Sequence, residues 1–218
     1  MTKKLFFLLM FAVGAQFTPL RGAALQRSSP LAGYAVAPTI SGAMPQGGAT
    51  SWNGAPASIY AGGWELTDQD GTKTPLDVFK GSPVIITMFY SSCPYSCPLL
   101  IESIKNKIEK KTSPSVRKNL RVLLITFDPT RDTPEKLKKL ASEKSIDLTR
   151  WKLLTAKEDV VRDIAAVLQV KYRPLPGGDF SHSSIIALLN PDGVITARVD
   201  GLNQPFEPIV EKLVITGR

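Results

Sequence analysis

Two apolar segments of strand length, residues 84–90 and 122–127, are separated by a segment with helical periodicity, and this arrangement constrains the fold most. Both segments are continuous apolar runs, which is typical of strands covered on both faces. After Pro98, apolar residues repeat at helical spacing at Leu100, Ile101, Ile104 and Ile108. A strand, a helix and a strand in this order predict two parallel strands joined by a crossover.

The segments on either side of this unit also carry clear signals. Residues 64–67 and 73–76 flank Asp70-Gly71, which predicts a β-hairpin. Thr133-Pro134-Glu135 predicts the start of a helix, with Thr as the cap and Pro in the first turn. Residues 151–154 predict a third strand.

The last third of the chain predicts a helix, a hairpin and a helix. Thr155-Ala156-Lys157-Glu158 matches a capping box, and the helix that it opens would turn Val161, Ile164 and Leu168 inward. Residues 184–190 and 194–199 are joined at Pro191-Asp192-Gly193, a connection short enough to require an antiparallel hairpin. A helix over residues 205–215 closes the chain.

This order of elements predicts an α/β fold. A βαβ unit first and a ββα unit last give a mixed sheet with helices on both faces. The layout is thioredoxin-like, with the N-terminal β-hairpin added and an αβα insertion between the two halves. The fold alone does not define a function.

Residues 1–24 follow the plan of a secretory signal peptide: a basic start, an apolar run at 5–13, and small residues before a cut after Ala15 or Ala24. A retained N-terminal anchor is the alternative. We expect an exported protein of the periplasm or the outer face of the inner membrane, in an oxidising compartment. Membrane proximity would then come through the N-terminus, and the net charge of +8 does not call for a nucleic-acid partner.

The composition changes at residues 25–62, where Pro, Gly, Ala and Ser dominate and Arg27 is the only charged residue. Such a segment cannot bury enough apolar surface to offset chain entropy. We expect a flexible segment at 25–62 and a folded domain at 63–218.

The only two cysteines of the chain, Cys93 and Cys97, lie between the strand at 84–90 and the helix that Pro98 is expected to open. Pro disfavours helical dihedrals at the residue before it, so we expect Cys97 at the N-cap and Cys93 on the preceding loop. Both sulfurs would then lie near the positive end of the helix, which favours thiolate.

Three kinds of chemistry suit this pair. A structural disulfide would close a loop so short that it removes only about 2 kcal/mol of unfolded-state entropy. A redox dithiol is the second alternative, although thioredoxin-like reductases have two residues between the cysteines and this chain has three. A metal site is the third: two thiolates and the imidazole of His182, the only His, suit three-coordinate Cu(I), whereas Cu(II) would need a fourth ligand such as water. Zinc with these three ligands and an open position would predict a catalytic water and a general base nearby.

Three motifs in this order resemble the Sco/SenC family of copper-binding proteins of respiratory oxidase assembly. They are Cys93-x3-Cys97-Pro98 after an apolar strand, Phe-Asp-Pro-Thr-Arg-Asp-Thr-Pro at 127–134, and Ser181-His182-Ser183 with Asn-Pro-Asp-Gly at 190–193. The resemblance extends from about Gly63 to the C-terminus.

The resemblance implies that Cys93, Cys97 and His182 bind one copper per chain, as Cu(I), Cu(II) or both. It implies a metallochaperone, rather than an enzyme, that delivers copper to the binuclear site of cytochrome c oxidase or keeps the cysteines of that site reduced. The partner would be the copper-bearing oxidase subunit or another copper or thiol protein. The alternative is an exported thiol–disulfide oxidoreductase that uses Cys93 and Cys97.

Two departures from the family pattern stand beside the ligands. Tyr95 and Ser96 lie between the cysteines, where family members usually carry an acidic residue, and Ser181 stands where Asp often precedes the His. Fewer negative charges near the thiolates should change metal affinity or redox potential. We interpret Asp128 and residues 131–134, which match the family's Asp-Pro-x-Arg-Asp-Thr-Pro signature, as a structural loop with a helix cap at Asp132 or Thr133.

Overall fold

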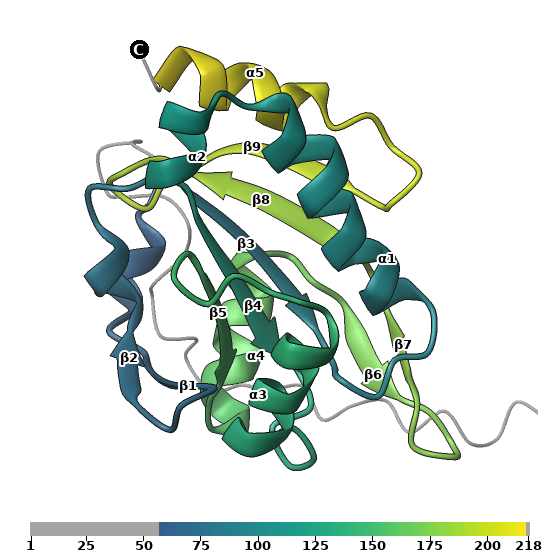
Figure 1. Ribbon diagram of the computed structural model, residues 1–218. Coiled ribbons are helices and arrows are strands. Elements are labelled where there is room, and N and C mark those ends of the chain that lie inside the picture. The colour runs from purple at the N-terminus through teal and green to yellow at the C-terminus, as the bar shows by residue number, and fades with distance from the viewer. Residues whose placement is uncertain (1–56, 217–218) are drawn as a thin grey trace, which may run out of the picture. The chain divides into compact units, whose positions relative to one another are not determined.

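The computed structural model describes residues 57–216, which form a mixed sheet flanked by helices (Figure 1). The seven-stranded sheet has the order β2-β1-β5-β4-β3-β8-β9. Its strands are β1 (Glu65–Asp68), β2 (Lys73–Pro75), β3 (Val84–Phe89), β4 (Arg121–Thr126), β5 (Trp151–Thr155), β8 (Ile185–Leu189) and β9 (Ile195–Asp200).

The centre of the sheet is mixed, as the sequence predicts, and its first two strands, β3 and β4, are parallel as predicted. Strands β3, β4 and β5 run parallel, whereas β8 is antiparallel to β3 and β1 is antiparallel to β5. Every residue of β3 is buried, as expected for a strand covered on both faces. The predicted thioredoxin-like α/β fold is confirmed, and both predicted hairpins, β1–β2 and β8–β9, are present.

The helices lie in the connections between strands, except for the last one, which follows β9. They are α1 (Ser96–Ser103), α2 (Pro114–Asn119), α3 (Pro134–Glu143), α4 (Glu158–Val167) and α5 (Glu207–Thr216). A π-helical turn over Ile104–Ile108 continues α1. Helix α5 lies beside this continuation (Figure 1), where Lys107 contacts the ring of Phe206. No helix within residues 57–216 is both long and apolar enough to cross a membrane.

The predicted capping box at Thr155 is wrong. Thr155 is the last residue of β5 and pairs with Thr67 of β1, so its backbone belongs to the sheet. Helix α4 begins three residues later, after an N-cap at Lys157 that makes no side-chain capping bond. The helix itself is present, and Val161, Ile164 and Leu168 are buried as predicted.

A short second sheet was not predicted. Strands β6 (Tyr172–Pro174) and β7 (Phe180–His182) pair antiparallel, with Tyr172 opposite His182. The sequence shows only a Pro- and Gly-rich loop here. Each strand has three residues, which is too few to give an alternating pattern. Gly177 and Gly178 both have positive φ, 94° and 90°, which lets the chain turn between the two strands.

The N-terminal limit of the domain differs from the expected one. Ile59 and Tyr60, in the segment expected to be flexible up to residue 62, are buried, and the amide of Ile59 donates to the carbonyl of Gly193 at 2.9 Å. Contacts with the core therefore begin before residue 63. Ile59 and Tyr60 are large side chains, and their burial in the core removes apolar surface from water. The predicted signal peptide or anchor at 1–24, and residues 25–56 of the flexible segment, lie outside the described residues.

Candidate metal centre

The two cysteines lie where β3 gives way to α1, at the carboxyl end of the parallel strands. Cys93 is in the connecting loop, and its amide donates to the carbonyl of Tyr90 at 3.3 Å. The prediction that Cys97 is the N-cap of α1 is wrong. Cys97 is the second residue of the helix, and Tyr95 is the N-cap. The helix can begin two residues before Pro98 because the missing N–H of Pro98 has no partner in a first turn.

The two sulfurs differ in their affinity for a proton. The amide of Cys97 donates to Sγ of Cys93 at 3.4 Å, and the hydroxyl of Ser96 lies 2.9 Å from the same sulfur. Hydrogen bonds from the Cys97 thiol and from Ser96 lower the pKa of Cys93 to about 3, although burial opposes this. The hydrogen bond to Cys93, together with burial, raises the pKa of Cys97. The reduced pair is therefore one thiolate and one thiol.

His182 reaches the cysteines from β7. Its ring packs edge-on against Tyr90, with centroids 5.8 Å apart, and is tilted against Phe127 at 5.2 Å. Nδ1 lies 3.3 Å from the carbonyl of Ser183, and Nε2 lies 3.2 Å from the hydroxyl of Ser96. When Nδ1–H donates to Ser183, Nε2 keeps a lone pair that faces Ser96 and the sulfurs.

The arrangement suits a soft cation. The ligand atoms of Cys93, Cys97 and His182 all lie within 4.8 Å of one another, and no other such group occurs among residues 57–216. Ser96 has one hydroxyl hydrogen for two acceptors, Sγ of Cys93 and Nε2 of His182, so one acceptor stays without a donor from this side chain. Two sulfurs and one imidazole nitrogen are a donor set that favours Cu(I).

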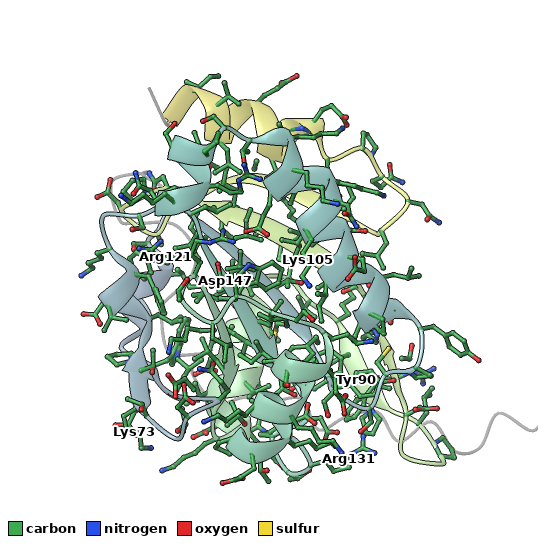
Figure 2. All side chains as sticks on the ribbon, in the orientation of Figure 1. Lys73, Tyr90, Lys105, Arg121, Arg131 and Asp147 are labelled. Atoms are coloured by element: carbon green, nitrogen blue, oxygen red, sulfur yellow. The ribbon has the colours of Figure 1, made fainter. Side chains whose placement is uncertain are left out.

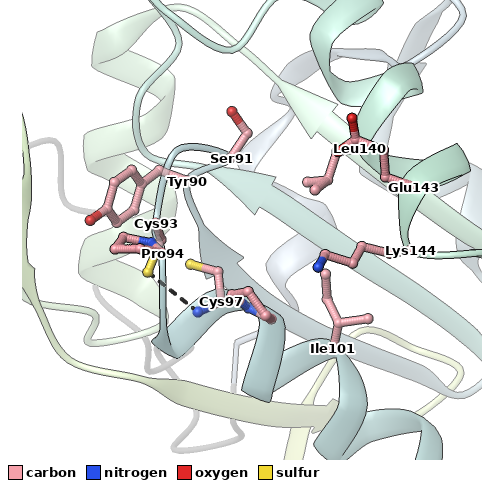
Figure 3. A pocket seen from close by; sticks show the side chains of 10 residues that line it. Tyr90, Ser91, Cys93, Pro94, Cys97, Ile101, Leu140, Glu143 and Lys144 are labelled. Atoms are coloured by element: carbon pink, nitrogen blue, oxygen red, sulfur yellow. Dashed lines mark hydrogen bonds between the residues drawn. The ribbon is translucent and has the colours of Figure 1, made fainter.

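A cavity of about 230 Å³ opens beside the sulfurs (Figure 3). Its wall includes both cysteines, Tyr90 and Ile101, with Lys144 at the α3 side. His182 does not line this cavity but a second hollow, next to Tyr172 and Arg173. Burial, followed by the charge of Cys93, raises the pKa of Tyr90 to about 12, so its hydroxyl keeps its proton beside the thiolate.

The signature loop touches the site in a way that the sequence did not indicate. Thr133 is the N-cap of α3, as predicted, and accepts from the amide of Lys136 at 3.4 Å. Asp132 is not a cap: it is fully buried and accepts from the amide of Ser91 at 2.8 Å. The contact of Ser96 with two of the ligands was also missed, since its position between the cysteines gives no sign of where its hydroxyl points.

Two of the three residues that depart from the family pattern, Tyr95 and Ser181, are exposed. Tyr95 is 79% exposed, so its ring projects into solvent next to the cysteines. Ser181 is exposed as well, because it alternates with the two inward side chains of β7, Phe180 and His182. Ser96 is half-buried, and its side chain contacts two of the ligands, Cys93 and His182.

Fold and site together define a thioredoxin-like protein with two cysteines and one histidine grouped at the carboxyl end of its parallel strands. The family model described as SCO1/SenC matches residues 53–215. The chain belongs to the SCO1/SenC family.

Known relatives of this family resemble the chain over most of the described domain. A SCO1 protein homolog of Bacillus subtilis is 23% identical over 150 residues, which cover 66% of this chain and 75% of the relative. The structure of yeast Sco1 with copper bound has a TM-score of 0.52 and 27% identity, covering 70% of this chain and 84% of that one. A structure of BsSco, described as a member of the Sco family of cytochrome c oxidase assembly proteins with a disulfide switch, has a TM-score of 0.60 and 21% identity, with coverages of 71% and 90%.

Proposed function

We propose that this protein is a copper metallochaperone that binds one copper ion through Cys93, Cys97 and His182. The observation that carries the proposal is the convergence of these ligand atoms within 4.8 Å of one another. One sulfur is already a thiolate, so the first metal–sulfur bond displaces no proton from Cys93. The second sulfur gives up its proton as copper binds.

The recipient is proposed to be the copper-bearing subunit of cytochrome c oxidase, at the periplasmic or outer face of the inner membrane. The copper-bound yeast Sco1 and the oxidase-assembly description of BsSco support this assignment. Copper is the cargo of a metallochaperone, so the site must be able to release the ion to the recipient as well as bind it. The cavity beside the sulfurs supports release, because an incoming thiolate can approach them without displacing His182.

A thiol–disulfide oxidoreductase is the second candidate, and the unequal pKa values of the two cysteines favour it. The Cys93 thiolate would attack a disulfide of the partner, forming a mixed disulfide and releasing one partner thiolate. Cys97, after losing its proton, would attack Cys93, forming the Cys93–Cys97 disulfide and releasing the second partner thiolate. Two electrons pass from this protein to the partner.

Copper titration of the reduced protein tests the metallochaperone proposal. Wild type should bind one equivalent of Cu(I) in competition with a chelator, Cys97→Ser should lose that stoichiometry, and His182→Ala should bind more weakly. Ser181→Ala, which changes the exposed neighbour of His182, is the matched control and should bind as wild type does. Retention of wild-type stoichiometry and affinity by Cys97→Ser would contradict the ligand assignment.

A further inference from the structure

The hairpin that carries His182 is joined to the rest of the domain by side chains. Within residues 57–216, β6 and β7 pair as strands only with each other. A two-stranded hairpin is marginally stable by itself in water. The distance from His182 to the sulfurs therefore depends on the contacts that the hairpin makes with its surroundings.

Aromatic packing supplies one set of these contacts. Phe180 and His182 are two residues apart in β7 and point to the same face. The ring of Phe180 lies 5.2 Å from both Tyr90 and Phe127. These rings keep the hairpin against the ends of β3 and β4.

Arg131 supplies a second, directional contact, from the loop between β4 and α3. Its guanidinium carbon lies 5.5 Å from the centroid of the Phe180 ring. The hairpin turn also lies against Arg131, because a Cβ added to Gly178 would lie 3.0 Å from Nη1 of Arg131. Nε of Arg131 is 2.5 Å from Oδ2 of Asp128, a carboxylate whose side chain is only 4% exposed. A buried partner thus orients the guanidinium toward the hairpin.

The next residue in the chain, Asp132, is directed to the other half of the site. Its carboxylate accepts from the amide of Ser91 at 2.8 Å and from the hydroxyl of Thr126 at 2.6 Å. Ser91 lies two residues before Cys93. The loop therefore contacts the cysteine segment through Asp132 and the histidine hairpin through Arg131. Figure 2 shows Tyr90 and Arg131 at the same end of the domain, opposite Arg121 at the start of β4.

We propose that Arg131 is a positioning residue, which holds the β6–β7 hairpin so that His182 faces Cys93 and Cys97 before copper arrives. The contacts of Arg131 are with Asp128 and the hairpin, not with the ligand atoms of Cys93, Cys97 or His182. The role in copper binding rests on the proposed function, whereas the positioning is a property of the metal-free protein. The two can therefore be tested separately.

Amide hydrogen exchange in the reduced, metal-free protein tests the positioning. The reporter is the amide of Ser183, which donates to the carbonyl of Lys171 at 2.8 Å and so closes the hairpin. Arg131→Gln should speed its exchange about three- to fivefold, as expected for the loss of a cation–π contact. Arg131→Lys keeps the charge without the planar fork and should have a smaller effect in the same direction.

The matched control is Arg117→Gln, the same change in charge on α2, near the start of β4 (Figure 1). It should leave exchange at Ser183 unchanged. If Arg131→Gln also leaves Ser183 exchange at the wild-type rate, the proposal is overturned. If Arg131→Gln does not fold, as judged by thermal melting, Arg131→Lys decides by the same criterion.

A double-mutant cycle tests the consequence for copper. Arg131→Gln should weaken Cu(I) binding about tenfold in the wild-type background, in the range found when an orienting contact behind a ligand is lost. It should cause no further loss in the His182→Ala background, because Arg131 acts through the imidazole. Equal losses in both backgrounds would overturn the proposal. If His182→Ala binds copper as wild type does, the ligand assignment fails instead, and exchange at Ser183 still decides the positioning role.

Discussion

The thiol and the amide of Cys97 both donate hydrogen bonds to Sγ of Cys93. The sulfur of Cys93 therefore carries the negative charge, while the sulfur of Cys97 keeps its proton. Each cysteine is less than 10% exposed, at 8% and 5%. A metal ion bound to both sulfurs, or a disulfide bond between them, can replace the proton between the two. The same pair therefore suits both metal binding and thiol exchange.

Alkylation should distinguish the two sulfurs by pH. The pKa of Cys93 is lowered from 9.0 to about 3, so Cys93 is a thiolate throughout the range from pH 5 to 8. The pKa of Cys97 is raised, so Cys97 keeps its proton over the same range. Iodoacetamide at pH 5 should modify Cys93 alone in the reduced, metal-free protein, and peptide mass mapping checks this. Modification of Cys97 first, or of both at equal rates, would show that the charge is assigned to the wrong sulfur.

Unfolding of the same reduced protein should show the corresponding dependence on pH. Cys93 binds fewer protons when folded than when unfolded between pH 3 and 9, so its contribution to stability increases as pH rises, by at most about 1.4 kcal/mol per pH unit. It is complete above the unfolded pKa and is lost as pH falls toward 3. Urea unfolding at pH 5 and pH 8 should give a smaller rise in stability for Cys93→Ala than for wild type.

Ser96→Ala should raise the pKa of Cys93. The Ser96 hydroxyl lies 2.9 Å from the sulfur and is the second hydrogen-bond cause of the low pKa. A hydrogen bond to a charged group contributes about 1.5–3 kcal/mol, so a rise of about one to two pKa units is expected. The rate of alkylation against pH measures it. Ser92→Ala, in the same loop but hydrogen-bonded to Lys136, is the control and should leave the pKa of Cys93 unchanged.

Asp132→Asn should destabilise the fold by about 1–3 kcal/mol, because a fully buried carboxylate loses its charge while several donors still face it. These donors are the amide and the hydroxyl of Ser91, the hydroxyl of Thr126 and the ammonium of Lys136 at 3.4 Å. Asp163→Asn, on an exposed part of α4, should change stability by less than about 0.5 kcal/mol. Equal stabilities for the two variants in urea unfolding would contradict this role for Asp132.

Much of the fold could be predicted because burial on both faces leaves a strong pattern in β3 and β4, whose residues are mostly apolar. The misassignments have local physical reasons. Thr155 has the residue type of a cap, but pairing with Thr67 across the sheet decides its conformation. The weak strands β6 and β7 have too few residues to give a periodicity.

The sequence predicted the three residues that the structure brings together, Cys93, Cys97 and His182, but not the residues that surround them. Cys93, Cys97 and His182 are rare residue types in this chain, so their positions after a strand and before a strand were informative. Ser96 and Arg131 are common types whose roles depend on where a hydroxyl or a guanidinium points. Sequence spacing does not contain that information.

Mild oxidation should convert the metal-free protein to a Cys93–Cys97 disulfide that no longer binds copper. Both cysteines are free, and Cys93 lies in a loop while Cys97 is in the first helical turn. A disulfide requires the two sulfurs to approach to about 2.05 Å. Because Cys93 lies in a loop, it can move toward Cys97 while the helix stays intact. Mass spectrometry should show the loss of two hydrogens, and reduction should restore one equivalent of Cu(I) binding. Only free thiols after oxidation, or copper binding by the oxidised form, would contradict this prediction.

His182→Ala should separate copper handling from thiol exchange. Nε2 of His182 contacts the Ser96 hydroxyl, which in turn contacts Sγ of Cys93. The imidazole does not line the cavity beside the sulfurs, so a disulfide that enters this cavity can react with Cys93 without contacting His182. Thiol–disulfide exchange requires only a thiolate and a disulfide. We expect His182→Ala to weaken copper retention greatly, since three ligands become two, and to change the reduction potential of Cys93–Cys97 little.

Oxidase maturation in cells then decides which chemistry matters. If copper handling is the function, strains with His182→Ala and with Cys93→Ser should both fail to assemble the oxidase at limiting copper, and added copper should rescue either one. Normal assembly in the His182→Ala strain beside failure in the Cys93→Ser strain would make the dithiol the functional group. Because His182 contacts the aromatic rings of Tyr90 and Phe127, thermal melting of the purified His182→Ala protein must first show a folded domain. A folded variant that fails in cells and recovers with copper identifies the imidazole as a ligand that the cell needs.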